Sequence, residues 1–555
     1  MGWVLFAIRY ARWLLADLLR RMRRPPSWVG FLIEVSPAEL PAPRGPFWRR
    51  LLNPPALDLR DLAARFQAVA REPRVQGVVV HLRPLQLSPA RVDALRELIA
   101  GLRRAGKRVV CWAPAYTSST YQVACAADEV LLQRGGSVEP LGVARDYVFL
   151  AEALERVGVE VDLLQITPYK SGYDALAKRG LTPEAREMAE WLAEAGFQEL
   201  VGAVAEGRSC DEGAARALID GSPYTDLQAL AAGAVDGVVG EEELPGRLAG
   251  RLEGWSSARR RLPRPRPPRP GRIVGLLRVE GTILDGRTRR APFKPPVTPP
   301  LLFEDQCGDL TLVQQARALA QSRRVGAVVL WVDSRGGSAL ASEAMAAALG
   351  ALAAKKPLVA VMGSVAASGG YYVTTPARAV FAQPGTLTGS IGVLAGKLVA
   401  GGLLDRLLLH RELVQRGRHA AMSSPERRFT DAERAKLQEA IERSYQVFLE
   451  RVAQARGRTA AEIQPVAGGR VWTGRQARER GLVDTLGGVE AALAEARRLG
   501  GLAADAPLQE ARTGRRELPP AVATAPAALA HALRLVAALN STSAWWLCPL
   551  VAGDG

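Results

Sequence analysis

The sequence contains few of the residues from which metal and redox sites are built. Its 555 residues include four histidines and five cysteines, and no two cysteines show the C-x-x-C spacing of zinc or thiol redox motifs. The cysteines are Cys111, Cys125, Cys210, Cys307 and Cys548. Buried free thiols are therefore expected, together with chemistry that needs no metal or other cofactor.

A long uninterrupted apolar run is also missing. Residues 3–19 are strongly apolar, but Arg9, Arg12 and Asp17 interrupt them, whereas a membrane-crossing helix needs about 20 apolar residues. On a helix these three side chains share one side, and a cluster of arginines follows at 20–24. Residues 1–27 are predicted to form an amphipathic helix on an anionic membrane surface, or else a helix docked on the protein's own body.

Lysine is scarce, because only eight of the 73 basic residues are lysines. The formal net charge of +17 comes mostly from scattered arginine. No zinc spacing, RNA-binding aromatic signature or long basic helix accompanies that charge, so nucleic acid is not an expected partner. With 48% hydrophobic and 23% charged residues, the composition is typical of a folded globular protein and excludes a mainly disordered one.

Short β-rich runs alternate with amphipathic helices through residues 28–251. The buried strands are expected at 78–82, 109–112, 130–132 and 159–164. Strands separated by helices favour parallel pairing in a layered α/β domain. Residues 259–272 then form a run of proline and arginine that is typical of an extended linker, which is assigned to 252–272.

The part beyond this linker repeats the part before it. The motif Arg-Val-Gln-Gly-Val-Val-Val at 74–80 returns as Arg-Val-Gly-Ala-Val-Val-Leu at 324–330. Val130 matches Val380, Gln165 matches Gln415 and Asp236 matches Asp484 at nearly the same spacing. Solenoid repeats are only about 20 to 50 residues long, so this period indicates a duplicated domain. The copies are assigned to 28–251 and 273–500, followed by a tail at 501–555.

A serine in the second copy has the surroundings of a nucleophile. Residues 362–372 read Met-Gly-Ser-Val-Ala-Ala-Ser-Gly-Gly-Tyr-Tyr, and Ser368 is expected where a strand gives way to a helix. Free N–H groups at a helix start favour an alkoxide and the oxyanion formed after it. A packing turn made of small residues is the alternative interpretation.

The glycines around this serine are missing from the first copy. The second copy carries Gly336 and Gly337 directly after a strand, where their backbone N–H groups could face a bound carbonyl, and Gly369 follows the serine. The first copy has Ser118 opposite Ser368 but no glycines beside it. Ser118 is therefore predicted to be inert.

A lysine shows the opposite asymmetry. Lys170 of the first copy lies opposite Ala420 of the second. A serine nucleophile needs a base, and a lysine removed from water can lose its proton near neutral pH, whereas arginine cannot. One composite site, with Ser368 from one copy and Lys170 from the other, is therefore predicted between the domains. Ser390 could orient the amine or could be a turn serine bonding its own backbone.

Four motifs in this order resemble the long form of bacterial signal peptide peptidase, also called protease IV. They lie at 169–171, 333–338, 366–371 and 388–393. The resemblance implies an α/β fold of two tandem ββα domains like crotonase and Clp protease, assembled as a bowl-shaped tetramer. It also implies a serine-lysine peptidase that cleaves apolar, membrane-derived peptides such as remnant signal peptides.

The resemblance assigns a role to each motif. It implies Ser368 as nucleophile and Lys170 as general base. The backbone N–H groups of Gly369 and of Gly337 or Gly336 would form the oxyanion hole. Ser390 and Ser171 would support the lysine.

Three features depart from the family pattern. Arg335 replaces the usual proline of the glycine turn, and the N-terminal anchor is the arginine-interrupted helix. The protein is therefore expected at the bacterial cytoplasmic membrane, peripheral or anchored, with the side left open. The tail has a short apolar helix expected at 527–539, followed by Trp545 and Trp546, as a membrane-interface or docking segment.

Two other classes of protein share parts of this pattern. A catalytically silent membrane scaffold would retain the motifs without activity, and a serine-directed covalent probe would leave it unlabelled. A crotonase-type acyl-CoA enzyme would share the oxyanion loops but needs no serine-lysine pair. Coenzyme A binding would identify the latter.

Overall fold

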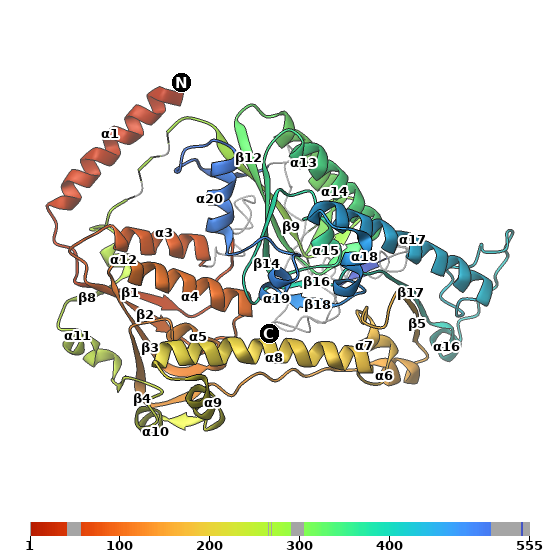
Figure 1. Ribbon diagram of the computed structural model, residues 1–555, viewed down its shortest axis with the longest axis horizontal. Coiled ribbons are helices and arrows are strands. Elements are labelled where there is room, and N and C mark those ends of the chain that lie inside the picture. Colours follow the sequence, from red (N-terminus) through yellow and green to blue (C-terminus); the bar gives the residue numbers. More distant parts are fainter. Residues whose placement is uncertain are drawn as a thin grey trace.

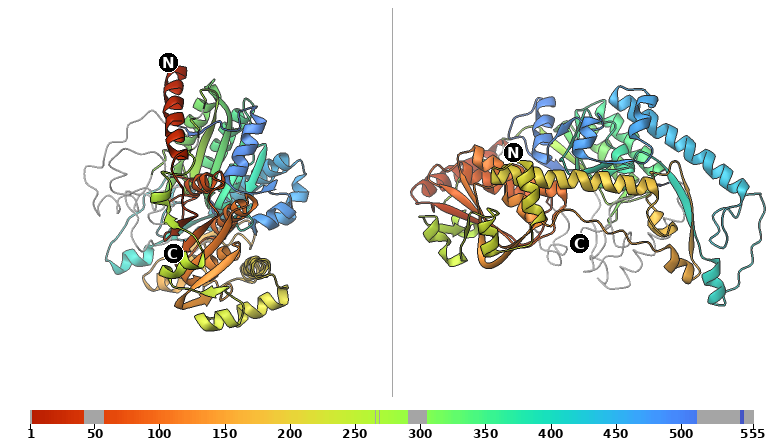
Figure 2. Two further views of the ribbon diagram at one scale, coloured as in Figure 1. Left: turned by 90° about the vertical axis from the view of Figure 1, so that its left-hand side faces the viewer. Right: turned by 60° about the horizontal axis from the view of Figure 1, so that its bottom comes forward.

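The computed structural model describes residues 2–41, 57–264, 266–267, 269–289, 305–511 and 545–547. Two α/β bodies lie side by side, with the helix α1 (Gly2–Arg21) projecting from the first (Figures 1 and 2). Each body corresponds to one copy of the sequence repeat. The tandem α/β architecture predicted from the sequence is therefore confirmed.

The first body is built on a seven-stranded sheet in the order β6-β4-β3-β2-β1-β8, with β7 beside β4. The strands are β1 (Trp28–Ile33), β2 (Gly77–Leu82), β3 (Arg108–Thr117), β4 (Glu129–Glu139), β6 (Tyr224–Thr225), β7 (Gly237–Val238) and β8 (Leu252–Gly254). β1 to β4 pair in parallel, as the alternation of strands and helices predicts. Because β8 pairs with β1, this sheet continues past Arg251, where the linker was expected to begin.

Helices cover both faces of this sheet. They are α3 (Leu59–Ala70), α4 (Pro89–Arg104), α5 (Ser118–Ala124), α8 (Pro183–Arg208), α9 (Glu212–Asp220), α10 (Asp226–Ala231), α11 (Leu244–Arg247) and α12 (Trp255–Ala258). α4 shows why they form: Pro89 suits a first helical position, and Val92, Leu95 and Ile99 form one buried face. The larger core lies between this face and the strands.

The second body has an eight-stranded sheet in the order β18-β16-β14-β12-β9-β20, with β15 beside β14 and β19 beside β15. The strands are β9 (Ile273–Glu280), β12 (Val325–Ser334), β14 (Leu358–Ala367), β15 (Ala379–Ala382), β16 (Leu387–Gly389), β18 (Val471–Thr473), β19 (Thr485–Leu486) and β20 (Leu508–Glu510). β20 lies beyond residue 500, so part of the expected tail belongs to this sheet.

Helices again form layers on both sides of the sheet. They are α13 (Asp309–Gln321), α14 (Ala339–Ala353), α15 (Gly369–Tyr372), α16 (Gly401–Arg406), α17 (Asp431–Arg456), α18 (Ala460–Ile463), α19 (Gly474–Glu479) and α20 (Val489–Leu499). α13, α14 and α17 share one apolar core with the strands. α20 packs on the opposite face. The position of Ser368 is thus set by a sheet buried on both faces.

The two bodies repeat details of hydrogen bonding as well as topology. The Val130 N–H group donates to Asp236 Oδ2 at 2.7 Å, and the Val380 N–H group donates to Asp484 Oδ2 at 2.7 Å. α8 and α17 are both 26 residues long. Two of the matched pairs, Val130 with Val380 and Asp236 with Asp484, therefore make the same contact in each copy.

A third sheet joins the two copies. Its order is β11-β10-β13-β21-β17-β5, formed by β5 (Glu160–Gln165), β10 (Thr282–Leu284), β11 (Gln306–Gly308), β13 (Gly336–Ser338), β17 (Leu394–Val399) and β21 (Trp545–Leu547). β5 of the first copy pairs antiparallel with β17 of the second along its full length. The assignment of 159–164 to a buried parallel sheet of the first copy was therefore wrong. A short apolar run predicts a strand but does not identify its partner.

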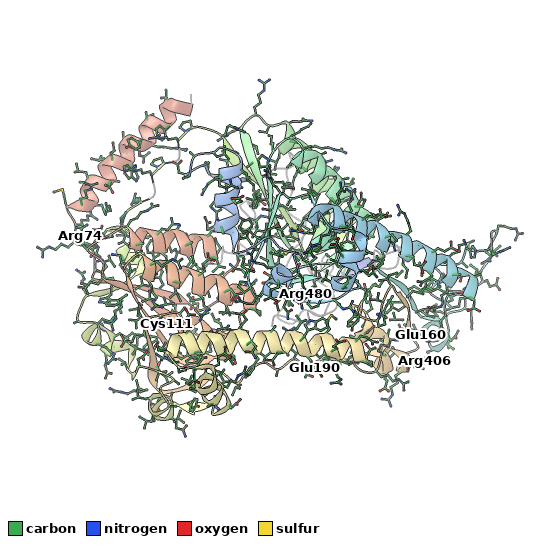
Figure 3. All side chains as sticks on the ribbon, in the orientation of Figure 1. Arg74, Cys111, Glu160, Glu190, Arg406 and Arg480 are labelled. Carbon is green, nitrogen blue, oxygen red and sulfur yellow. The ribbon has the colours of Figure 1, made fainter. Side chains whose placement is uncertain are left out.

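The segment that carries β5 leaves the first body and lies against the second. β5, α6 (Ala151–Arg156) and α7 (Asp174–Ala177) lie near β17 and far from β4 (Figure 1). Figure 3 shows Glu160 and Arg406 from opposite copies at this end of the molecule. α8 runs back from here to the first sheet, and its Trp191 ring stacks on Trp472 at 4.9 Å between centroids. The first copy therefore reaches deep into the second.

α1 contacts the body through a few polar groups. Arg20 pairs with Glu72 at 2.8 Å, and Trp13 Nε1 donates to Arg264 O at 3.1 Å. Apolar side chains such as Val4 and Leu15 remain exposed. Among the residues described, none of the helices has the length and apolar character required to traverse a bilayer. The predicted helix is present. Its Asp17 and Arg20 are partly buried, whereas Arg9 and Arg12 are exposed together with several apolar side chains.

Candidate active site

Ser368 occupies a sharp turn between β14 and α15. Its backbone has φ 58° and ψ −119°, a conformation that a residue with a Cβ rarely adopts. Two main-chain hydrogen bonds hold the turn: Ser368 N–H donates to Gly389 O at 2.8 Å, and Tyr372 N–H donates to Ser368 O at 2.9 Å. The strand-to-helix position expected from the sequence is the one observed. Such a turn presents a serine hydroxyl at the end of a sheet.

The Lys170 amine lies directly against this hydroxyl. Lys170 Nζ is 2.8 Å from Ser368 Oγ, 2.8 Å from the main-chain oxygen of Ser390 and 3.0 Å from Ser390 Oγ. All three residues are 0% exposed. The structure therefore brings together the two half-sites that the repeat comparison assigned to different copies. The Ser390 hydroxyl also contacts the Lys170 amine, as the interpretation that it orients the lysine requires.

The loop that carries Lys170 is held from both copies. The Gln165 side chain donates to Lys170 O at 2.8 Å and to Asp174 Oδ1 at 2.7 Å. From the second copy, a Cβ added at Gly469 would lie 2.6 Å from Lys170 Cα, and one added at Gly392 would lie 3.2 Å from Lys170 Cδ. Because these two glycines have no side chains, there is space for the Lys170 backbone and side chain between the copies.

Sequence reasoning did not identify Gly392 and Gly469 as site residues. Gly392 lies in the 388–393 motif and Gly469 lies in a Gly-Gly pair. The presence of glycine was the one signal in the sequence that could have indicated a close approach of another segment at these positions. Ser171, predicted to support the lysine, is buried next to it. Its described hydrogen bond uses its main-chain oxygen, which accepts from Asp174 N–H at 3.1 Å.

The glycine strand β13 lies beside the serine. Gly336 N–H donates to Ser334 Oγ at 3.1 Å, so that group has a partner within the protein. A Cβ on Gly337, where φ is 153°, would lie 2.0 Å from Ile283 O. A Cβ on Gly369 would lie 3.3 Å from Gly337 N. Gly369 therefore lies close to the glycine strand. A side chain on Gly337 would displace Ile283 of β10, and one on Gly369 would meet Ser342 Oγ at 2.6 Å as well as this strand.

The equivalent serine of the first copy has ordinary structural partners. Ser118 begins α5, and its Oγ donates to the main-chain oxygens of Glu139 and Gly142, each at 3.4 Å. Among the described hydrogen bonds, none joins Ser118 to a lysine amine. That it is inert stays a prediction.

A buried polar cluster lies behind the serine strand. Ser364 Oγ lies 2.7 Å from Ser88 Oγ of the other copy and donates to Glu39 Oε1 at 3.1 Å. Burial, together with the negative charge of Asp333, raises the pKa of Glu39 to about 8. Asp333 also accepts from Val365 N–H at 3.0 Å. A carboxyl that holds its proton at neutral pH therefore contacts β14 four residues before Ser368.

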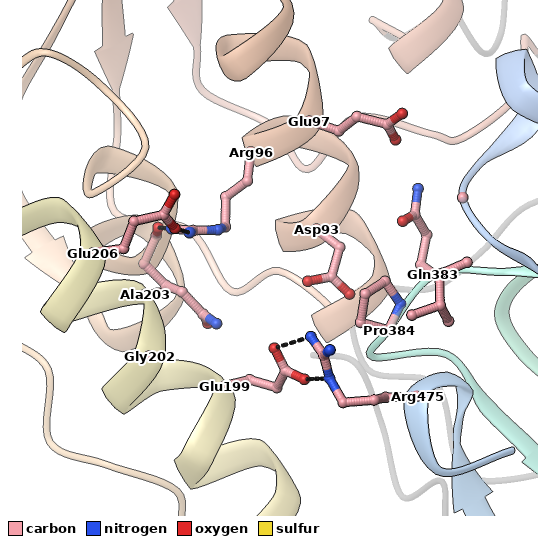
Figure 4. A pocket seen from close by; sticks show the side chains of 13 residues that line it. Asp93, Arg96, Glu97, Glu199, Gly202, Ala203, Glu206, Gln383, Pro384 and Arg475 are labelled. Atoms are coloured by element: carbon pink, nitrogen blue, oxygen red, sulfur yellow. Dashed lines mark hydrogen bonds and ion pairs between the residues drawn. The ribbon is translucent and has the colours of Figure 1, made fainter. Parts of the chain in front are cut away.

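A separate cleft of about 430 Å³ lies where the two copies meet (Figure 4). It is lined by Asp93 and Glu199 of the first copy and by Arg475 of the second, which pairs with Glu199. Burial raises the pKa of Asp93 to about 7. Neither Ser368 nor Lys170 lines this cleft. The ion pair of Arg475 with Glu199 joins the two copies here.

Two segments of the chain, residues 101–253 and 350–503, match the model of peptidase family S49. The chain belongs to this family. The first S49 segment contains Lys170 and the second contains Ser368, so each match covers one half of the site. The family resemblance inferred from the four motifs is thereby confirmed.

Curated relatives extend the S49 likeness over most of the chain. The chloroplastic serine protease SPPA of Arabidopsis thaliana is 28% identical over 457 residues, covering 80% of this chain and 65% of that protein. Protease 4 of Salmonella typhi is 29% identical over 462 residues, covering 80% and 72% respectively. A putative signal peptide peptidase SppA of Enterococcus faecium is 32% identical over 196 residues, covering 35% and 56%. The chain thus spans about two thirds of the length of its long relatives.

Proposed function

We propose that this S49 protein is a serine endopeptidase with a serine-lysine dyad. The observation that carries the proposal is the 2.8 Å separation of Lys170 Nζ and Ser368 Oγ, with both residues 0% exposed. That distance lies within the range required of a base that removes a proton from a nucleophile. The identities of the relatives, which include Protease 4, support the same activity.

The reaction begins with attack of Ser368 Oγ on a peptide carbonyl carbon. Neutral Lys170 Nζ takes the hydroxyl proton as the C–O bond forms, and the carbonyl oxygen becomes an oxyanion. Lys170 then gives this proton to the leaving amine as the C–N bond breaks, leaving an acyl ester on Ser368. A water attacks the ester with Lys170 again as base, which releases the acid and restores the serine.

The oxyanion is assigned to the N–H groups of Gly337 and Gly369. Gly336 N–H already donates to Ser334 Oγ, so Gly337 is favoured over it. Ser390 and its main-chain oxygen hold the lysine amine toward Ser368. This arrangement supplies a base, a nucleophile and two donors without a cofactor.

The substrate class is assigned to apolar peptides at a membrane surface. The name of the Enterococcus faecium relative refers to signal peptide peptidase, and signal peptides have apolar cores. Val4, Ile8 and Leu15 form part of an exposed apolar face on α1, next to basic residues at its end. We assign this face to a membrane surface, where such a helix binds through apolar burial and attraction to anionic lipid.

The protein is proposed to assemble head to tail as a homotetramer. Within one chain, β5 of the first copy pairs with β17 of the second. The repeat equivalents of these strands are 410–415 and 144–149, and no described strand pairs with either segment. Val148 and Val414 are 68% and 86% exposed there. Pairing 144–149 of one chain with 410–415 of the next would repeat the observed join and close a ring.

A serine-directed covalent probe tests the proposed activity. The probe should label the full chain at Ser368, and Ser368→Ala should lose both labelling and peptide cleavage, by at least about 10⁴-fold. Ser118→Ala is the matched control and should keep both. A chain that is never labelled would be a silent scaffold. A chain that is unlabelled but binds coenzyme A would instead be an acyl-CoA enzyme.

A further inference from the structure

The residue before the lysine has a partner in the other copy. The Arg470 guanidinium lies over the Tyr169 ring, 3.9 Å from the ring centroid. Tyr169 directly precedes Lys170 in the first copy, whereas Arg470 directly precedes β18 of the second. A guanidinium at this distance from an aromatic face is attracted electrostatically by the ring. This cation–π contact therefore joins the loop that carries the lysine to the copy that carries the serine.

Arg470 is also connected to the lysine by a second route. Its main-chain oxygen accepts a hydrogen bond from Ser390 N–H at 2.7 Å. Ser390 in turn contacts Lys170 Nζ through its hydroxyl, at 3.0 Å, and through its main-chain oxygen, at 2.8 Å. The Arg470 side chain donates to Ala467 O at 3.2 Å, which holds the guanidinium on its own turn. Arg470 thus contacts both the ring that precedes the lysine and the serine that binds its amine.

The Tyr169 ring is held by the first copy as well. Its hydroxyl donates to Glu187 Oε2 at 2.6 Å, and the ring stacks on Trp191 at 6.2 Å between centroids. Both partners belong to α8, which passes beside β18 (Figure 1). Trp191 Nε1 donates to the main-chain oxygen of Val471, the residue after Arg470, at 3.0 Å. The ring is therefore fixed by α8 on one copy and by Arg470 on the other.

We propose that Arg470 is a positioning residue of the dyad. Its guanidinium, held over the Tyr169 ring, keeps the Lys170 amine within hydrogen-bond distance of the serine. This role rests on the proposed peptidase function. The guanidinium keeps its proton and takes no part in the proton transfers. Loss of the contact would let the lysine loop shift away from the serine, and a misplaced catalytic group lowers the rate without preventing substrate from binding.

Arg470→Met tests this role, because it removes the cation and keeps an unbranched side chain. The variant should cleave an apolar peptide with kcat lowered by about tenfold and KM within about twofold of the wild-type value. The serine-directed probe should label its Ser368 more slowly by the same factor as kcat. Arg470→Lys retains a cation for the ring and should recover most of the loss.

A matched control is available within the second copy. The Arg480 guanidinium lies 3.9 Å from the centroid of the Trp472 ring, the same distance as in the pair of Arg470 with Tyr169. Arg480 and Trp472 both belong to the second copy, so their contact does not join the copies. Arg480→Met removes the same kind of interaction and should leave kcat, KM and the labelling rate unchanged.

A double-mutant cycle assigns the effect to the Tyr169 ring. Tyr169→Leu should lower kcat by about tenfold, whereas Tyr169→Phe keeps the ring and should stay near the wild-type value. Adding Tyr169→Leu to Arg470→Met should cause little further loss, because the contact is already absent, whereas independent effects would multiply to about a hundredfold. If Arg470→Met does not fold, the comparison of Tyr169→Leu with Tyr169→Phe tests the same contact from the first copy.

Three results would contradict this role in different ways. Independent effects in the cycle, or an unchanged kcat in Arg470→Met, would overturn it while leaving the peptidase function intact. A raised KM with unchanged kcat would also overturn it, because Arg470 would then contact substrate rather than position the lysine. Failure of the probe to label the wild type would instead overturn the peptidase function itself.

Discussion

At the scale of residues, the site depends on a few side chains held in unusual backbone conformations. Ser368 and Ser390 both have positive φ, 58° and 50°, and both contact Lys170. Such conformations persist only where surrounding contacts impose them. Here the imposing contacts are the main-chain bonds from Ser368 to Gly389 and from Ser390 to Arg470. The hydroxyls are therefore positioned before substrate binds.

The identity of the base can be tested at Lys170. Lys170→Ala and Lys170→Arg should each lower kcat/KM by at least about 10³-fold, because alanine has no amine and arginine keeps its proton. Lys178→Ala, eight residues away on the surface, is the control and should leave kcat/KM unchanged. Peptide cleavage assays at several pH values provide the measurement. Near-normal activity of Lys170→Arg would contradict the proposed role.

The protonated carboxyl of Glu39 predicts how stability varies with pH. Its pKa is raised to about 8 in the folded chain against 4.5 in the unfolded one, so the folded state binds more protons between these values. The free energy of unfolding should therefore fall as pH rises from about 5 to 8. Glu39→Gln should reduce this dependence, whereas Glu34→Gln, at an exposed position, should not. Urea unfolding at several pH values across this range measures the dependence. The prediction would be refuted if the free energy of unfolding of Glu39→Gln varied with pH as steeply as that of the wild type.

At the scale of elements, the candidate active site depends on the pairing of β5 with β17. The loop that follows β5 delivers Lys170, and the Gly468-Gly469 turn of the second copy lies against it. A Cβ at Gly469 would lie 2.6 Å from Lys170 Cα and 2.6 Å from Lys170 N. Glycine is therefore required at this position by close approach of two backbones.

Gly469→Ala should thus displace the lysine. A shift of about 1 Å in a catalytic group costs roughly 10²-fold in rate, so kcat should fall by at least that factor. Gly457→Ala is a matched control, because Gly457 also has positive φ, 61°, but has open space around its Cβ position. Thermal unfolding should show lower stability in both variants because of the positive φ, with a larger loss in Gly469→Ala because of its clash with Lys170. Equal kcat values in the two would contradict the steric explanation.

At the scale of the whole molecule, the internal repeat gives one chain two copies of the same domain, joined by the pairing of β5 with β17. The segment equivalent to β17 in the first copy is 144–149, and the segment equivalent to β5 in the second copy is 410–415. Neither segment is paired with a described strand. A ring of such chains would satisfy every one of these edges, which a free monomer leaves open to other pairing.

Val148→Asp or Val414→Asp should break this assembly, because a buried carboxylate at the new interface would lack a partner. Leu227→Asp, at a similarly exposed position on α10, should leave it intact. Light scattering during gel filtration should give the mass of a tetramer for the wild type and the control, and a smaller mass for the two interface variants. A wild-type chain that runs as a monomer would refute the assembly.

The sequence alone determined that the domain is duplicated and that each copy lacks the site residues that the other copy keeps. Lys170 against Ala420, and Gly336 and Gly337 against Gln86 and Leu87, indicated one site shared by two copies. Such comparisons succeed because paired repeats occupy equivalent places in the fold, so a missing group in one copy is visible beside the other.

Only the tertiary structure decided which partners the strands have. It paired 159–164 with β17 rather than with its own sheet, gave Gly336 N–H a partner in Ser334, and placed Trp545–Leu547 along Gly336–Ser338. Apolar periodicity is a local property, and it reports that a segment forms a strand with a buried face. Pairing between segments more than 200 residues apart depends on edges and spaces that exist only after the chain has folded.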